Sequence, residues 1–414
     1  MRVTLVGTGV QGSAIALILS RIPEVAEIVC SDINYSRAKK VAKKLQSEKI
    51  RTERVDASDP EDLLRVSKES DVIINATPTK FNPGIMEAAL KGGSHYVALA
   101  SGDPLRELEL SRRWEDAGLS AVIYQGGPFV MNVLVRLAAD ELDRVDEIRL
   151  RFGWKSSGMK EATHAWSPAW CPEEALAEWT NEPLIYENGR FKRAPTFSGM
   201  EIYEFPKPMG EVELCFVDYE PVYTLPRFIG KGVRYVDCKI PPDRAAKALI
   251  EMGFTSVELI RVGDVEVVPR DVLLALTPQP ADTCIELLAK PEDLKEIRFE
   301  RDVLICFLAE VKGEKAGEGI TRTFYRISSF SENFKKFGTP WAEVALPASL
   351  TTLMLASGEI ESKGVIPPEC LDPRKFLKRL ADWGIMFEEN CSSKHSIKTS
   401  DSYQMGSKEL SSRL

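Results

Sequence analysis

The amino-acid sequence predicts an α/β protein: a doubly wound parallel sheet into which a second, α+β domain built on an open antiparallel sheet is inserted. Two observations favour this fold class. Short apolar runs alternate with amphipathic stretches over the first 125 residues, and such alternation requires parallel strands joined by right-handed crossovers. Turns, prolines and tryptophans then dominate until helical patterns return near residue 341.

The first 125 residues hold short β-branched strands, each followed by a helix. The predicted strands cover residues 2–7, 27–32, 51–57, 71–77, 95–100 and 120–126. The predicted helices cover residues 13–22, 36–46, 60–69, 83–93 and 105–118. Elements of this type and spacing build consecutive βαβ units.

The rest of the chain divides into an inserted domain, a C-terminal segment and a tail. The inserted domain, 126–340, is predicted to hold a strand at 146–154, a helix at 243–254, a strand at 256–262, and two antiparallel strands within 301–328 around a Gly-Glu-Lys turn. Residues 341–388 are predicted to form helices that pack back on the first domain, one of them capped by Asp372. Residues 389–414 are polar, serine-rich and aperiodic, which is typical of a mobile tail.

The composition indicates which general classes of protein fit this chain and which do not. The chain has 414 residues, of which 44% are hydrophobic and 28% charged, as in a water-soluble protein of two domains. Its net charge of −8 argues against nucleic acid as a partner, because phosphates require a basic surface. No apolar run approaches the ~20 residues of a membrane span, and the N-terminal stretch lacks the basic start and cleavage site of a signal peptide.

The eight cysteines lie far apart, and no two of them form a CxxC pair. None stands near His95, His164 or His395 at the spacing of metal ligands. Most lie in apolar runs, which is typical of buried free thiols. We therefore expect no metal site and a reducing, cytoplasmic setting.

The opening stretch VTLVGTGVQGSAIALILS carries three glycines in the spacing GxGxxG. It follows a predicted strand and opens a predicted helix, the context in which this motif binds a dinucleotide. Gly7 permits a tight turn, Gly9 lets the backbone approach a pyrophosphate, and Gly12 lets the helix pack close to the strand. Val10 and Gln11 complete a helix N-terminus whose free N–H groups attract phosphate. The alternative is a close-packed turn with no ligand.

An acidic residue ends the second predicted strand, as a dinucleotide-binding sheet of the Rossmann type requires. Asp32 follows Gly12 by 20 residues, and a carboxylate there hydrogen-bonds the ribose hydroxyls and repels a 2′-phosphate, which favours NAD over NADP. Ile33 follows at the same strand end and belongs to the predicted cofactor site. Arg37 and Lys39 lie close by and leave NADP open.

The ends of the next three predicted strands meet at the same edge, where open α/β sheets bind their ligands. The first end is expected at the adenine, with a plain loop as the alternative, and the second beneath the nicotinamide ribose, with a plain turn as the alternative. The predicted cofactor contacts at these ends are Asp56, Ala57, Asn75, Ala76, Thr77, Pro78, Ala100 and Ser101.

Several stretches taken together resemble the saccharopine dehydrogenase family. In the first domain and just beyond it these are NATP, ALKGGSHYV, ASGD, QGGPFVMN and EIVCSDINYSRAKKVA. Further along they are AWSP, NGRF, SGMEIYEFP, EPVYTLPR, VKGEK and KGVIPPECLDPRKFL. The likeness covers nearly the whole chain before the tail, and the ordered set is specific to the family but not to one substrate.

The resemblance implies an NAD(P)-dependent oxidoreductase that acts at a carbon–nitrogen bond of an amino acid or opine, as saccharopine and lysine dehydrogenases do. Hydride would pass between nicotinamide C4 and the carbon of an amine/imine pair. Members commonly hold a substrate carboxylate with the arginine that ends the EPVYTLPR-like stretch, which is Arg227 here; a surface arginine is the alternative. The resemblance also implies a homodimer paired through the inserted domain.

The chain departs from the family where members carry an acidic helper. Gly127 stands before the proline of QGGPFVMN, Phe129 stands after it, and Ala98 replaces an aspartate in the fifth strand. A proton-transfer group must therefore come from elsewhere, unless the substrate differs from saccharopine.

The best single candidate for that group is Asp103, which ends the fifth strand, with a helix cap as the alternative. His164 titrates near neutrality, with a packed core histidine as the alternative. Tyr124, Asp218 and Glu220 are further candidates.

Two functions follow from these residues. The first is the dehydrogenase just described, which the glycine motif, Asp32 and Arg227 favour. The second is a dinucleotide-binding sensor or scaffold without dehydrogenase activity, which the missing acidic positions favour. The sequence does not name the substrate or the direction of the reaction.

Overall fold

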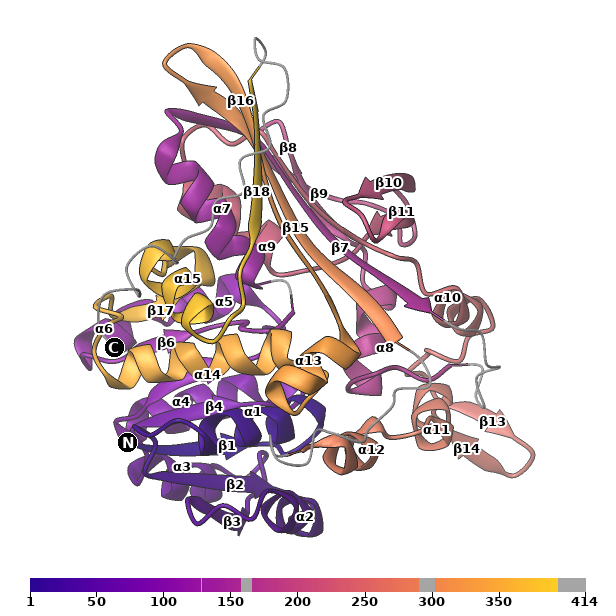
Figure 1. The fold of residues 1–414 in the computed structure, drawn as a ribbon. Helices are drawn as coiled ribbons and strands as arrows, with labels where there is room; N and C mark the ends of the chain where they lie inside the picture. Colours follow the sequence, from indigo (N-terminus) through magenta and orange to yellow (C-terminus); the bar gives the residue numbers. More distant parts are fainter. Residues whose placement is uncertain (128, 158–165, 290–301, 394–414) are drawn as a thin grey trace.

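The computed structural model describes residues 1–127, 129–157, 166–289 and 302–393. Figure 1 shows a parallel sheet with its helices at one end of the molecule and a larger twisted sheet at the other. The chain completes six strands of the first sheet, builds eight of the nine strands of the second, returns to the first with β17 (Gly364–Ile366), and completes the second with β18 (Glu388–Ser393). The predicted fold class, a doubly wound sheet with an inserted domain, is confirmed.

Seven parallel strands build the first sheet in the order β17-β6-β5-β4-β1-β2-β3. The first six are β1 Arg2–Val6, β2 Glu27–Asp32, β3 Ile50–Arg54, β4 Val72–Asn75, β5 His95–Ala98 and β6 Ser120–Val122. All six lie where the sequence predicts strands. We expected only helices in the C-terminal segment, but β17 pairs in parallel with β6. The strand order reverses between β1 and β4, and such a switch point is where ligands bind.

Helices cover both faces of this sheet. They are α1 Val10–Ser20, α2 Tyr35–Leu45, α3 Pro60–Lys68, α4 Asn82–Gly92, α5 Pro104–Glu109, α6 Ser111–Asp116, α14 Ala342–Ala356 and α15 Pro373–Asp382, with short turns η1 Thr79–Phe81 and η3 Pro368–Cys370. α14 packs beside α1 and against β4 and β5, and α3 packs beside α4. Asp372 caps α15, as predicted. The helix predicted over 105–118 is divided into α5 and α6 at Leu110.

The second sheet has nine strands, in the path β10-β11-β12-β7-β15-β16-β18 with β8 and β9 attached to β12. They are β7 Arg144–Ser157, β8 Leu184–Glu187, β9 Arg190–Arg193, β10 Glu201–Phe205, β11 Gly210–Phe216, β12 Tyr235–Ile240, β15 Asp302–Lys315, β16 Glu318–Ser329 and β18 Glu388–Ser393. The predicted antiparallel sheet needs one correction, because β7 and β12 run parallel. The long connection between them contains helices, which allows the chain to re-enter the sheet in the same direction.

β15 and β16 form the predicted long hairpin, but its turn is Ala316–Gly317 and not Gly-Glu-Lys. Lys315 pairs with Glu318 across the turn, and the two turn residues have φ of 52° and 83°. Positive φ at both positions is the two-residue geometry that matches the twist of the strands.

Seven further helices belong to the described part of the second domain. They are α7 Phe129–Glu141, α8 Pro172–Thr180, α9 Pro221–Ile229, α10 Arg244–Glu251, α11 Pro269–Leu276, α12 Pro280–Leu287 and α13 Phe330–Phe337. The sequence analysis did not predict α7 or α9. α7 is buried almost all round, so it lacks an amphipathic pattern, and α9 contains Pro226, which is unusual inside a helix.

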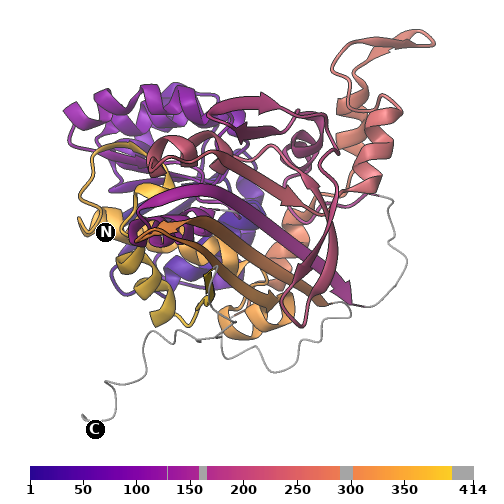
Figure 2. The same cartoon turned by 90° about the horizontal axis from the view of Figure 1, so that it is seen from above.

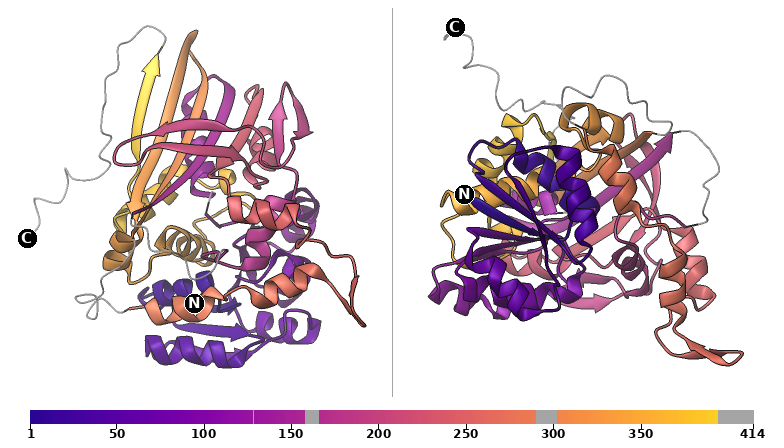
Figure 3. Two further views of the ribbon diagram at one scale, coloured as in Figure 1. Left: turned by 90° about the vertical axis from the view of Figure 1, so that its right-hand side faces the viewer. Right: turned by 90° about the horizontal axis from the view of Figure 1, so that it is seen from below.

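An arm projects from the second domain, as Figure 2 shows. It contains α11 and the hairpin of β13 Ile260–Val262 and β14 Val265–Val267. The strand predicted at 256–262 is thus limited to its last three residues. Leu259 and Val265 of this arm are 65% and 61% exposed. The next helix, α12, packs against α1 and α2 (Figure 3), and Asp282 pairs with Lys40 there at 2.8 Å.

Five residues predicted to belong to a mobile tail form part of a strand instead. Residues 389–393 belong to β18, which pairs antiparallel with β16 from Ile320 to Tyr325. This pairing gives the polar segment the backbone hydrogen bonds that its composition does not reveal. The remaining tail residues lie outside the described part of the chain.

Candidate functional site

The loop between β1 and α1 shows which glycine leaves room for a ligand. Gly7 has φ of 97°, and a Cβ there would lie 2.7 Å from the carbonyl oxygen of Ala76. A Cβ on Gly12 would lie 2.0 Å from the carbonyl oxygen of Gly7, so this glycine lets α1 pack on the loop. A Cβ on Gly9 would meet no atom within 4 Å. Open space at this middle glycine is what the approach of a pyrophosphate requires.

The N-terminus of α1 lies at this open space. Gly9 is the N-cap, so no side chain caps the first turn, and that turn carries no acidic residue. Val10, Gln11 and Gly12 are the first residues of the helix, and the N–H groups of a first turn carry partial positive charge. The loop and the helix therefore fit the pyrophosphate of a nicotinamide dinucleotide.

Asp32 ends β2 beside this loop and is buried. Its Oδ2 accepts the N–H and the hydroxyl of Thr8 at 2.9 and 2.8 Å, and its Oδ1 accepts the N–H of Asn34 at 2.8 Å. Arg37 lies 3.6 Å from Oδ2. Asp32 thus fixes the glycine loop, and Thr8 is a residue of the site that the sequence analysis missed. Ile33 is 59% exposed at the end of the same strand.

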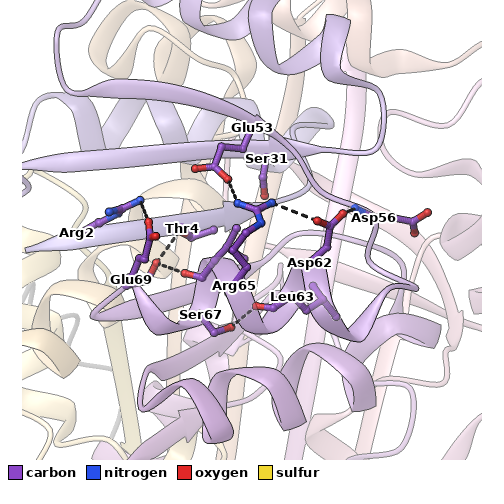
Figure 4. A network of polar contacts seen from close by, with 12 residues as sticks. Arg2, Thr4, Ser31, Glu53, Asp56, Asp62, Leu63, Arg65, Ser67 and Glu69 are labelled. Carbon is purple, nitrogen blue, oxygen red and sulfur yellow. Dashed lines mark hydrogen bonds and ion pairs between the residues drawn. The ribbon is translucent and has the colours of Figure 1, made fainter.

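The loop after β3 has a structural role. Asp56 accepts the N–H and the hydroxyl of Ser58 at 2.9 and 2.6 Å, and these bonds lower the pKa of Asp56. Asp62 of α3 accepts the N–H of Asp56 at 3.1 Å and pairs with Arg65 (Figure 4). These contacts favour the plain-loop alternative, and an adenine contact of Asp56 and Ala57 stays a prediction.

Asn75 holds the loop after β4. Its Nδ2 donates to Asn82 and to the hydroxyl of Tyr96 at 2.8 and 2.9 Å, and its Oδ1 accepts the N–H and the hydroxyl of Thr77 at 3.0 and 2.7 Å. The side chain of Asn75 is therefore used within the protein. It shapes residues 75–78, and Ala76 forms the wall behind the glycine loop.

The loop after β5 places two buried polar groups at the same edge. The carbonyl oxygen of Ala100 and the carboxyl of Glu107 accept hydrogen bonds from Asn82 at 2.8 and 2.9 Å. Burial raises the pKa of Glu107 to about 7. Ser101 is buried next to them, and its N–H donates to Glu220 at 2.9 Å.

Glu220 brings the second domain to this edge, since it immediately precedes α9. Burial raises the pKa of its carboxyl to about 7, and repulsion from Glu107 and Asp218 adds to the rise. A carboxyl with a pKa near neutrality can both take up and release a proton at physiological pH. Asp218, another candidate, is instead bound to Arg193 and Tyr223 at 2.9 Å each.

Two more carboxylates come from α8. Glu174 accepts the N–H of Thr79, just after the β4 loop, at 2.8 Å. Glu178 accepts the hydroxyl of Tyr219 at 2.6 Å. Burial raises the pKa of Glu178 to about 8, and repulsion from Glu220 and Glu174 contributes. We call Glu174, Glu178 and Glu220 the acidic group.

The sequence analysis missed the two glutamates of α8. Their spacing of four residues, shortly after the proline of CPEEALAEW, is the signal that could have found them. A proline at the start of a helix and residues four apart predict two side chains on one helix face.

Tyr124, another candidate, is buried in a polar network away from solvent. Its hydroxyl bonds Thr224 of α9 and donates to Glu369 at 3.2 Å, and Asn132 of α7 donates to the same carboxylate oxygen at 2.8 Å. Burial raises the pKa of Tyr124 and of Glu369. This network joins β6, α7, α9 and η3, so it holds these elements together.

Of the three residues predicted as catalytic, Asp103 and Arg227 lie in the described part of the chain. Asp103 is exposed and caps α5 by accepting the N–H of Arg106 at 3.1 Å, which is the alternative role weighed for it. Arg227 is exposed on α9, seven residues after Glu220, and thus about 10 Å further along the helix. His164 lies outside the described residues.

The described residues contain free cysteines but no group of metal ligands and no helix that could span a membrane. In residues 1–127, 129–157, 166–289 and 302–393, no three or more His, Cys, Asp or Glu side chains are grouped to hold a metal ion. The described cysteines are free, and five of the eight are buried. Within the same ranges no helix has the length and apolar character needed to cross a membrane.

Two protein-family models together match residues 3–385 of this chain. Residues 3–122 match the saccharopine dehydrogenase NADP binding domain, and residues 94–385 match the saccharopine dehydrogenase C-terminal domain. The carboxyaminopropylagmatine dehydrogenase of Synechocystis is 24% identical over 411 residues, covering 94% of this chain and 97% of the relative. The carboxynorspermidine synthase of Vibrio cholerae is 25% identical over 387 residues and covers 86% of each chain.

A solved structure shows the same fold. Saccharopine dehydrogenase (L-Glu forming) from Saccharomyces cerevisiae superposes with a TM-score of 0.68 at 18% identity, covering 94% of this chain and 99% of that one. The second family model alone spans more than half of the chain. These matches confirm the predicted resemblance and, with it, a nicotinamide-linked enzyme acting at a carbon–nitrogen bond: the chain belongs to the saccharopine dehydrogenase family.

Proposed function

We propose that this enzyme oxidises or forms a carbon–nitrogen bond in a substrate that carries both an amine nitrogen and a carboxylate, with Glu220 as the proton-transfer group. The observation that carries the proposal is that Glu220, a carboxyl of pKa about 7, is bound to the loop after β5, at the same edge of the sheet as the open glycine loop after β1. The relatives from Synechocystis and Vibrio are named for carboxylated amines, which supports this substrate class.

The roles follow from the chemistry of the bond. A bound nicotinamide supplies or accepts the hydride at the carbon. Oxidation of CH–NH to C=N also releases one proton from the nitrogen, and the carboxylate of Glu220 takes it up; the reverse reaction returns it. The N–H of Ser101 holds one carboxylate oxygen of Glu220, which orients the carboxyl toward a fixed position.

A pair of variants tests Glu220 against Asp103. Glu220→Gln cannot transfer a proton and is expected to lower kcat by about 100-fold or more, measured by absorbance of the reduced nicotinamide. Asp103→Asn removes only the charge of a helix cap and is expected to keep kcat within a few-fold. The assignment fails if Asp103→Asn abolishes turnover while Glu220→Gln does not.

We propose NAD as the preferred cofactor. Asp32 supports this choice, because a carboxylate at the end of β2 repels the extra phosphate of NADP. Arg37 is engaged with Asp32 at 3.6 Å and so is not held free for a phosphate. The family model is named for NADP, so the dissociation constants of NADH and NADPH decide the point; tighter binding of NADPH would contradict the proposal.

The alternative function, dinucleotide binding without turnover, gives a different result. A panel of lysine, saccharopine, simple opines and carboxylated polyamines is expected to include a substrate. If NADH bound tightly and no member of the panel reacted, the sensor or scaffold function would replace the enzyme.

We also propose that Arg227 binds the carboxylate of the substrate. We propose further that the protein is a homodimer and that it lies in the cytoplasm. The exposed apolar residues of the arm support a protein contact, since large exposed apolar surface is typical of interfaces. Light scattering is expected to give twice the mass of the chain, and a monomer mass would contradict the dimer.

A further inference from the structure

Glu107 of α5 is a buried carboxyl with no role in the proposed reaction. It is only 6% exposed, and Nδ2 of Asn82 donates to one of its oxygens at 2.9 Å. The same Nδ2 donates to the carbonyl oxygen of Ala100 at 2.8 Å, and Oδ1 of Asn82 accepts a hydrogen bond from Asn75, which shapes the loop after β4. Glu107 is therefore held in one orientation at the edge of the sheet. Buried glutamates are rare, so its place beside the candidate site requires an explanation.

Ser101 joins Glu107 to Glu220. Its hydroxyl is hydrogen-bonded to the carboxyl of Glu107, and its N–H donates to Oε1 of Glu220 at 2.9 Å. Ser101 is itself only 9% exposed, so water has little access to this contact. α5 also packs against α9, which begins directly after Glu220. A carboxyl of the first domain thus lies next to a carboxyl of the second, and two such groups repel each other when both are ionised.

Glu107 is the strongest charge that acts on Glu220. Its repulsion of Glu220 exceeds that of Asp218, which is paired with Arg193 at 2.9 Å. The other acidic side chains that face the two carboxyls are Asp103 at the start of α5 and Glu178 of the acidic group. Further titratable groups near the pair are neutral at physiological pH, because burial raises the pKa of each; they are Tyr96, Tyr124, Tyr219 and Cys238.

We propose that Glu107 is a positioning residue for proton transfer: as an anion bridged to Glu220 by Ser101, it strengthens Glu220 as a base toward the substrate nitrogen. Without the charge of Glu107, Glu220 would lose its proton at a lower pH and would take up the proton of the substrate less readily. The inference rests on the proposed function for the role of Glu220 in the reaction. The effect of Glu107 on the ionisation of Glu220 can be measured without turnover.

NMR of the protein without substrate tests this effect directly. The side-chain carboxyl signals of isotope-labelled glutamate are followed from about pH 5 to pH 9, and Glu220 is identified by the signal that Glu220→Gln removes. Glu107→Gln keeps the shape of the side chain and removes its charge, so Glu220 is expected to titrate about 0.5 pH unit or more lower than in the wild type. Asp103→Asn is the matched control, because Asp103 is an exposed carboxylate that caps the same helix; the titration of Glu220 is expected to stay unchanged in this variant.

A second variant serves if Glu107→Gln does not fold, as thermal midpoints and NADH binding report. Ser101→Ala keeps the N–H bond to Glu220 and removes the hydroxyl, whose bond favours the ionised form of Glu107. Glu107 is then protonated more readily and repels Glu220 less, so Glu220 is expected to titrate at a lower pH in this variant too. An unchanged titration of Glu220 in the folded variants overturns the inference.

The pH dependence of kcat separates this inference from the proposed function. In the wild type, the rate of amine oxidation is expected to rise with pH as Glu220 loses its proton, and the midpoint of this rise is expected at a lower pH in Glu107→Gln. If the NMR titration shifts and the kinetic midpoint does not, Glu107 acts on Glu220 as inferred, but Glu220 is not the proton-transfer group. If the kinetic midpoint matches Glu220 in the wild type and the titration is the same in Glu107→Gln, the proposed function stands and the inference fails.

Discussion

The glycines of the loop between β1 and α1 differ in the space around them. Gly9 faces open space, and its φ of −69° is one that any residue can adopt. Gly12 is enclosed, because its Cα faces the carbonyl of Gly7. The same amino acid is therefore required by the packing at Gly12, whereas at Gly9 it leaves space that we expect a ligand to use.

Substitution by alanine separates these two tasks. Gly9→Ala is expected to raise the dissociation constant of the cofactor about tenfold or more, because the methyl group fills the space for the pyrophosphate. Its cost in folding is about 1 kcal/mol or less, the loss of a good N-cap residue. Gly12→Ala places a methyl group 2.0 Å from a carbonyl oxygen and is expected to destabilise the fold by about 3 kcal/mol.

Cofactor titration and thermal denaturation of both variants give the test. A Gly9→Ala protein that binds NADH like the wild type would show that no phosphate approaches Gly9. A Gly12→Ala protein of normal stability would show that α1 shifts freely.

At the scale of elements, the parallel pair β7–β12 depends on a buried ion pair. Arg151 of β7 and Asp237 of β12 are each 1% exposed and lie 2.7 Å apart, and Glu201 of β10 also contacts the guanidinium. Burial by itself lowers the pKa of Arg151, but the carboxylates of Asp237 and Glu201 outweigh this effect and raise the pKa, so Arg151 stays charged. The pair links strands that are 86 residues apart in the chain, so it ties α8 and α9, which lie between them, to the sheet.

Removal of one partner is expected to be costly. Asp237→Ala leaves Arg151 buried with less compensation and is expected to lower the free energy of unfolding by about 3 kcal/mol, measured by urea denaturation. The control is Glu213→Ala, which breaks the exposed pair with Arg244 and is expected to cost less than about 1 kcal/mol. Equal effects of the two variants would contradict a structural role for the buried pair.

At the scale of the molecule, the site exists only where the two domains meet. β6, α7, α9 and η3 come from distant parts of the chain and join through the network of Tyr124 and Glu369. This junction fixes the start of α9, and therefore Glu220, against the loop after β5. The carboxyls gathered there make the stability of the whole protein dependent on pH.

The sign of that dependence follows from the raised pKa values. Glu107 and Glu220 have pKa values of about 7 and Glu178 of about 8, whereas an unfolded chain gives about 4.3. The folded protein thus holds protons that the unfolded chain has released, so stability is fully present below about pH 4.3 and is lost as the pH rises through 7 to 8.

The thermal midpoint is expected to fall between about pH 6 and pH 8.5, and to fall less in Glu178→Gln, which has no charge to bury. Carboxyls with lowered pKa values, such as Asp56 and Asp62, lose their contribution only in acid and do not affect this range. Scanning calorimetry at several pH values is the measurement. A wild-type midpoint that rises over the range, or equal slopes for the two proteins, would contradict the expected effect.

Much of the parallel sheet and of the glycine loop was predictable from the sequence. The alternation of strands and helices and the glycine spacing are local patterns, so six of the seven parallel strands and the open loop at Gly9 followed from them. Other features resisted prediction because local signals were weak or misleading. β17 is three residues long, α7 is buried all round, and α9 carries Pro226.

The sequence by itself determined the fold class and the family and predicted the glycine loop as the dinucleotide site, because each depends on residues close together in the chain. Only the tertiary structure decided which acidic groups lie at the edge of the sheet where that loop stands. Asp103 caps α5 and Asp218 is bound to Arg193 and Tyr223, whereas Glu174 and Glu220 contact the loops after β4 and β5 from the second domain. The raised pKa values of these glutamates arise from burial and from contacts between distant segments, and burial of this kind leaves no periodic pattern in the chain.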